Sequence, residues 1–157
     1  MSEATYTVER NLLVEADPAR VQRELVDFHR WTAWSPWEDL DPDLRRSYSG
    51  AAEGVGSVYE WSGNRKAGQG RMEITEVRPG DAVVVDLRFL KPFKSQSVTT
   101  FRTVPEGSGT RVTWSMTGPR TAALKVMGLF TSMDKLVGKD FEKGLTRLKA
   151  VAETPVG

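Results

Sequence analysis

The chain has 157 residues, of which 39% are hydrophobic and 27% are charged, a size and composition typical of one globular domain. It contains no Cys and a single His, which excludes disulfides, thiolate metal sites and most sites that need a pair of histidines. The 22 basic residues are balanced by 21 acidic ones, so no excess of positive charge is available to recruit nucleic acid.

The N-terminal part of the chain predicts a strand, a short helix and then a turn-rich segment. Apolar and mostly polar residues alternate over Thr5–Val14, which indicates a half-buried strand. Asp17 and Pro18 offer a helix N-cap and a first-turn proline, so a short amphipathic helix should begin there. Pro36 disfavours helical geometry at the residue before it, and we expect the helix to end near His29. The first residues carry no secretory signal pattern, which predicts a cytoplasmic protein.

Six further strands are predicted in the middle of the chain. β-Branched and aromatic residues gather in six segments, and each segment is bounded by turn-forming residues such as Gly, Pro, Asn and Asp. The expected strands are Leu44–Ser49, Gly56–Trp61, Gly70–Val77, Ala82–Leu90, Ser95–Val104 and Thr110–Met116. Their connections are short, which favours sequential antiparallel hairpins.

The C-terminal part predicts one long amphipathic helix over residues 132–153. Its apolar residues fall within about half of the helical wheel when 100° is taken per residue. Such a helix must bury its apolar side, and the only large partner in the chain is the predicted sheet. We therefore expect an α+β architecture in which a seven-stranded antiparallel sheet wraps around the C-terminal helix, with one or two short helices after the first strand.

This order of elements resembles the START-like superfamily and, more narrowly, the polyketide cyclase/dehydrase family of SRPBCC proteins. The resemblance rests on the Asp17-Pro18 helix start, the Trp31–Trp37 segment, the Gly109–Trp114 hairpin strand and the closing helix. It implies the helix-grip fold, which is START-like and Bet v 1-like, in a single START-like domain over residues 1–157. The core of that domain is expected over about residues 5–153, with residues 154–157 as a tail.

The resemblance also implies a deep apolar cavity between the sheet and the long helix, and the aromatic content of the chain agrees with it. The residues expected to line this cavity and bind a ligand are Trp34, Trp37, Tyr59, Trp61, Met72, Leu87, Phe89, Phe101, Trp114, Met116, Val137 and Phe141. Large aromatic residues are also typical of a plain core, and a slip of one residue in strand register would turn a whole strand's set outward. No catalytic residue is assigned.

Three functions remain open at this point. The first is binding of a small hydrophobic ligand, whether aromatic, polyketide-like or lipidic. The second is a polyketide cyclase, aromatase or dehydratase that acts by confinement and by polarising carbonyls. The third is a protein-interaction module of the Hsp90-activator-like or toxin-like type. We expect no metal and no cofactor, a small hydrophobic molecule as the partner, no nucleic acid and no integral membrane segment, while a homodimer remains open.

Several features have two interpretations. The Trp31–Trp37 segment either plugs the end of the sheet as a small core or forms the floor of the ligand site. Arg71 and Glu73 form a polar pair inside the cavity unless Met72 and Ile74 point inward. Gly144 marks either a close contact between helix and sheet or room for a ligand. A basic stripe, Lys135, Lys139, Lys143 and Arg147, is a solvated helix face or a docking surface for an acidic partner.

Overall fold

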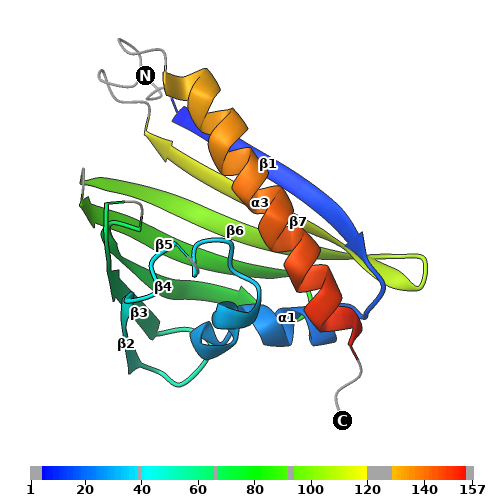
Figure 1. Ribbon diagram of the computed structural model, residues 1–157. Helices are drawn as coiled ribbons and strands as arrows, with labels where there is room; N and C mark the ends of the chain where they lie inside the picture. The colour runs from blue at the N-terminus through cyan, green and yellow to red at the C-terminus, as the bar shows by residue number, and fades with distance from the viewer. Residues whose placement is uncertain (1–4, 39, 66, 92–93, 120–128, 155–157) are drawn as a thin grey trace.

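The computed structural model describes residues 5–38, 40–65, 67–91, 94–119 and 129–154 (Figure 1). They form one antiparallel sheet, a short helix, a 3₁₀ helix and a long C-terminal helix. The strands are β1 (Thr5–Val14), β2 (Arg45–Gly50), β3 (Ser57–Ser62), β4 (Gln69–Arg78), β5 (Ala82–Lys91), β6 (Ser95–Glu106) and β7 (Gly109–Pro119). The helices are α1 (Pro18–Leu25), the 3₁₀ helix η1 (Phe28–Ala33) and α3 (Leu129–Glu153).

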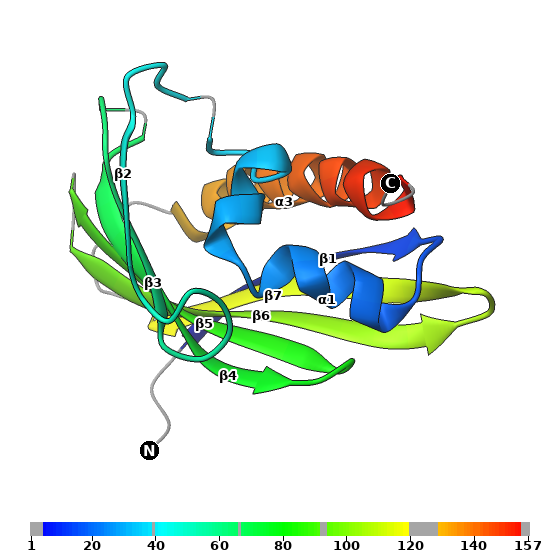
Figure 2. The same ribbon diagram turned by 90° about the horizontal axis from the view of Figure 1, so that it is seen from below.

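The sheet has the strand order β1-β7-β6-β5-β4-β3-β2, so every hairpin from β2 to β7 joins neighbouring strands. β1 closes the order by pairing with β7, from Thr5 opposite Pro119 to Val14 opposite Thr110. The sheet curves, and α3 crosses its concave side near β1 and β7, whereas β2 and β3 lie at the far edge (Figure 2). This arrangement confirms the predicted helix-grip fold. No helix in the described part of the chain is long and apolar enough to cross a membrane.

The predicted N-terminal helix is two elements in the structure. Asp17 caps α1 as expected, since its Oδ1 accepts a hydrogen bond of 2.8 Å from the backbone N–H of Arg20. α1 ends at Leu25, however, and η1 begins three residues later. His29 is therefore the second residue of η1 and does not end the first helix. Its ring lies 2.9 Å from the Asp27 carboxylate and stacks on Tyr48 with 3.9 Å between the ring centroids.

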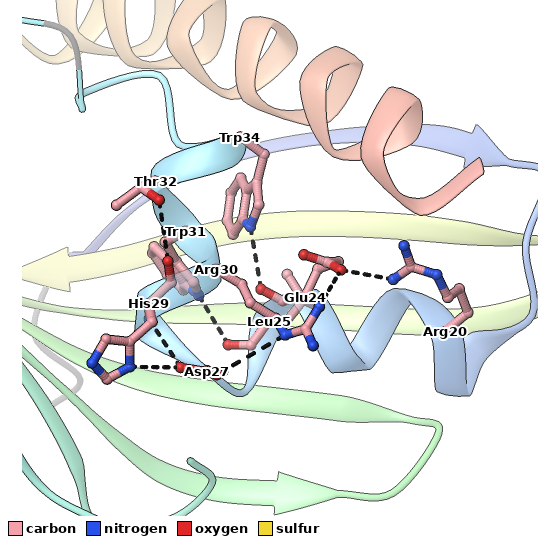
Figure 3. Close-up of polar contacts among 9 residues, drawn as sticks. All are labelled: Arg20, Glu24, Leu25, Asp27, His29, Arg30, Trp31, Thr32 and Trp34. Carbon is pink, nitrogen blue, oxygen red and sulfur yellow. Dashed lines mark hydrogen bonds and ion pairs between the residues drawn. The ribbon is translucent and has the colours of Figure 1, made fainter. Parts of the chain in front are cut away.

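Two indole groups satisfy the carbonyls at the end of α1 (Figure 3). The last carbonyls of a helix have no partner within the helix and need one from elsewhere. Trp31 Nε1–H donates to the Leu25 carbonyl at 3.0 Å, and Trp34 Nε1–H donates to the Glu24 carbonyl at 3.2 Å. The first half of the Trp31–Trp37 segment is thus a local core that fixes the turn from α1 into η1.

A buried carboxylate joins the same two helices. The side chain of Glu24 is 3% exposed, and its Oε1 accepts hydrogen bonds from Arg20 Nη1 at 2.7 Å and Arg30 Nη1 at 3.0 Å (Figure 3). Arg20 also donates to the Val151 carbonyl at 3.0 Å, near the end of α3. A buried charge is tolerated when it is paired and hydrogen-bonded, and both conditions are met here.

Candidate functional site

An aromatic cavity of about 190 Å³ lies between the concave side of the sheet, the segment that follows η1, and α3. Residues from β3, β4, β5, β6 and β7 form one wall, and Val137 and Phe141 of α3 face them. The full lining comprises Trp31, Ser35, Trp37, Glu38, Leu40, Leu44, Tyr59, Trp61, Ala67, Met72, Leu87, Phe89, Thr99, Trp114, Met116, Val137 and Phe141.

The structure gathers ten of the twelve predicted site residues around this cavity. These are Trp37, Tyr59, Trp61, Met72, Leu87, Phe89, Trp114, Met116, Val137 and Phe141. Trp34 and Phe101 are placed elsewhere, because both are fully buried in the core and contact each other edge to face. Trp34 is held there by its hydrogen bond to the end of α1. Whether the ten bind a ligand stays a prediction.

The strand register explains which side chains face the cavity. Tyr59, Met72 and Leu87 are direct partners across β3, β4 and β5, so they form one row on the concave side. Their neighbours along each strand point to the other face. Arg71 and Glu73 therefore flank Met72 on the convex side, where they form a half-exposed ion pair of 3.1 Å. The interpretation of this pair as a polar group inside the cavity is wrong.

Two glycines let aromatic rings lie flat along the cavity wall. A Cβ atom on Gly70 would lie 2.3 Å from Trp61 Cη2, so the bare backbone there accommodates the Trp61 ring. A Cβ atom on Gly144 of α3 would lie 2.7 Å from Trp114 Cζ3 and 2.9 Å from Pro36 Cδ. Gly144 thus marks close packing of helix on sheet, and the alternative that it leaves room for a ligand does not hold.

The segment after η1 is tied to α3 on one side of the cavity. Trp37 Nε1–H donates to Asp140 Oδ2 at 3.1 Å, and Arg147 Nη1 donates to the Ser35 carbonyl at 3.3 Å. Arg147 is half-buried, whereas the other three members of the predicted basic stripe are exposed. Arg147 therefore holds the cavity wall in place and does not belong to a free basic surface.

The polar residues in the cavity lining are Ser35, Thr99, Tyr59 and Glu38, and Glu38 holds the main hydrogen-bond cluster. Its carboxylate accepts a hydrogen bond of 2.9 Å from the Tyr59 hydroxyl at Oε1 and one of 2.6 Å from Arg46 Nε at Oε2. Arg46 also donates to the Glu38 carbonyl at 3.2 Å, which fixes the backbone of the segment. Burial, reinforced by the negative charge of Glu38, raises the pKa of Tyr59 far above its ordinary value, and its hydroxyl stays protonated at neutral pH.

Sequence reasoning missed Glu38 because no motif marks it. Its position directly after Trp37 is the only signal, and its partners Arg46 and Tyr59 come from two different strands. The side chains of Leu40 and Leu44 were also missed, since they belong to a turn-rich segment without periodicity. Within the described ranges, no group of three or more His, Asp or Glu side chains is arranged to hold a metal ion.

Taken together, the observations define a helix-grip protein with an apolar interior cavity. The family described as polyketide cyclase / dehydrase and lipid transport matches residues 5–153. The chain belongs to this family, which confirms the resemblance drawn from the sequence. No curated protein sequence matches the chain.

Solved structures share this fold at low sequence identity. A protein from Chromobacterium violaceum is 17% identical with a TM-score of 0.68, over 95% of this chain and 98% of that one. The di-domain ARO/CYC StfQ from the steffimycin biosynthetic pathway is 16% identical with a TM-score of 0.70, over 95% of this chain and 51% of StfQ. Ara h 8.0201 is 12% identical with a TM-score of 0.67, over 95% and 98%. These likenesses show the fold alone.

Proposed function

We propose that the protein binds a small hydrophobic ligand in the cavity between the sheet and α3. The observation that carries this proposal is the open space of about 190 Å³ inside an otherwise packed aromatic core. Protein interiors are close-packed, and an empty space lined by apolar groups lowers stability in proportion to its volume. A wide apolar lining with a few polar groups is typical of sites that bind small molecules.

A catalytic function is the second candidate, and the hydrogen-bonded pair of Glu38 and Tyr59 at the cavity favours it. Such a cyclase, aromatase or dehydratase would act on a polyketide-like substrate, as the description of the family as polyketide cyclase / dehydrase suggests. The proton of Tyr59 is engaged by Glu38, and the Glu38 carboxylate is engaged by Arg46. Both groups are thus already engaged with each other or with Arg46, and no further proton-transfer partner is placed beside them among the residues that the structure describes, so we place binding first. In a protein-interaction module we would expect the cavity to be filled by the protein's own side chains, whereas this cavity is open.

Toluene binding followed by NMR tests this proposal with a probe of defined size. We expect saturable shifts at methyl groups of lining residues such as Met72 and Leu87, and loss of binding in Val137→Phe, which fills the cavity from α3. Val98→Phe is the matched control, because Val98 is 45% exposed on β6 and does not line the cavity.

Native mass spectrometry of protein purified from its own host provides an independent measurement. A stoichiometric small molecule that survives in wild type and in Val98→Phe but is lost from Val137→Phe supports the proposal. A folded wild-type protein that binds neither toluene nor any co-purifying molecule contradicts it.

A further inference from the structure

Glu38 and Tyr59 together present hydrogen-bond acceptors at one place in the cavity lining. Glu38 and Tyr59 both line the cavity, and their side chains join each other at 2.9 Å. An ionised carboxylate accepts hydrogen bonds only, at about four lone-pair positions. In Glu38, one of these is used by Tyr59 and one by Arg46, so the carboxylate can accept further bonds.

Tyr59 adds a second acceptor because its only proton is already donated. The residue is 3% exposed and its hydroxyl donates to Glu38 Oε1. The high pKa of this hydroxyl keeps the proton in place across the neutral range. The phenolic oxygen retains its lone pairs and can accept a bond from a molecule inside the cavity.

The charge of Arg46 lies outside the cavity. Arg46 is on the edge strand β2, its side chain is 31% exposed, and it is absent from the cavity lining. It contacts the carboxylate at Oε2, whereas Tyr59 contacts Oε1. A ligand inside therefore faces the carboxylate and not the guanidinium. An anionic group placed there would be repelled and would also lose its hydration.

The volume of the cavity fits a ligand of about one ring. A dry cavity of about 150 Å³ in another protein accommodates benzene. The present cavity is slightly larger, at about 190 Å³, which leaves room for a few additional heavy atoms. The T-shaped pair of Trp61 and Phe89, with 5.4 Å between centroids, offers ring faces and edges for such a ligand.

We propose that the cavity selects neutral, single-ring compounds of the phenol class, whose O–H donates to the Glu38–Tyr59 pair. This inference rests on the proposed binding function and adds the chemical class of the ligand. A hydroxyl is recognised because it donates a hydrogen bond to the acceptors of this pair. Compounds of the same size with only a methyl or ether group leave the acceptors without a partner, and carboxylates are excluded by charge.

A ligand series of constant shape tests the proposal on the wild-type protein. The probes are p-cresol, p-xylene, 4-methylanisole and p-toluate, measured by calorimetry or by NMR titration at neutral pH. We expect p-cresol to bind at least tenfold more tightly than p-xylene, which corresponds to about 1.4 kcal/mol. We expect 4-methylanisole to bind no better than p-xylene, and p-toluate not to bind.

The possible outcomes distinguish a failure of the proposed selectivity from a failure of the proposed binding function. Equal affinity for p-cresol and p-xylene overturns the selectivity and leaves hydrophobic binding intact. Failure of both to bind contradicts the binding function, and the selectivity falls with it. Tighter binding of p-toluate than of p-cresol also overturns the inference, because it would require a cationic group at the cavity.

A pair of matched variants assigns the selectivity to Glu38. Glu38→Gln keeps the size of the side chain but removes its charge and offers an N–H₂ group in place of one acceptor. We expect the preference for p-cresol over p-xylene to fall at least threefold. Glu60→Gln on the exposed face of β3 is the control and should keep the wild-type preference. An unchanged preference in folded Glu38→Gln overturns the assignment.

Discussion

Gly144→Ala should destabilise the protein although it raises the intrinsic helix propensity at this position. The added Cβ would lie 2.7 Å from Trp114 Cζ3 and 2.9 Å from Pro36 Cδ, and both neighbours are held in the packed core. Replacing Gly by Ala inside a helix gains about 0.8–1.0 kcal/mol of intrinsic propensity. Overpacking a core contact costs about 1–3 kcal/mol. The net expectation for Gly144→Ala is a loss of about 1 kcal/mol in the free energy of unfolding.

Gly138→Ala in the same helix is the matched control. The three atoms nearest to its Cβ would be guanidinium atoms of Arg10, the closest at 2.2 Å, and these belong to the far end of a flexible side chain that is 30% exposed. Moving the guanidinium would disturb its contact of 3.6 Å with Glu142, which as a surface ion pair is worth about 0–1 kcal/mol, and its exposed hydrogen bond of 2.7 Å to the Glu9 carbonyl. The propensity gain offsets this cost, so Gly138→Ala should be neutral or slightly stabilising.

Urea denaturation followed by circular dichroism measures the free energy of unfolding of both variants. In thermal denaturation, a loss of about 1 kcal/mol corresponds to a decrease of about 2–4 °C in Tm for a chain of this size. Equal stability of Gly144→Ala and Gly138→Ala would show that close packing against Trp114 does not limit position 144.

Three further outcomes are expected. Gly70→Ala should displace the Trp61 ring, because the new Cβ would clash with that ring and would lie 2.6 Å from a backbone oxygen of β5. Tryptophan fluorescence should change and toluene binding should weaken. Unchanged toluene binding would contradict this expectation. Glu24→Gln should lower the unfolding free energy by about 2–3 kcal/mol in denaturation, because its two arginine partners lose their buried counter-charge. Burial raises the pKa of all three tyrosines, so unfolded chains ionise first. The contribution of the tyrosines to stability should be constant below about pH 10 and should be lost above it, with phenolate absorbance rising as the protein unfolds.

The strands and the long helix could be predicted because their signals are local. Alternating residues such as Tyr6 and Val8 report one buried face of β1, and both are buried in the structure. The same periodicity placed Met72 and Leu87 on the cavity side, which the register shows them to share. The observed strand boundaries differ from the predicted ones where pairing with a distant strand sets them. β7 extends beyond the predicted end at Met116 to Pro119, which pairs with Thr5 of β1.

The polar side of the cavity could not be predicted because it depends on contacts between distant residues. Glu38 is held by Arg46 from β2 and by Tyr59 from β3, and nothing in the spacing of these residues indicates the pairing. Likewise, hydrophobicity alone does not separate Trp34 from Trp37. Trp34 turns into the core to reach the Glu24 carbonyl, whereas Trp37 reaches Asp140 on α3 and lines the cavity.

The pairing of β1 with β7 has a consequence for the order of folding. The two strands are about 100 residues apart in the chain, whereas the hairpins from β2 to β7 join neighbours in sequence. Contacts between distant segments form slowly because a long loop must be closed first. During synthesis, β1 therefore cannot form its pairing in the sheet until β7 has been synthesised. The cavity is finished later still, since Val137 and Phe141 of α3 form its last wall.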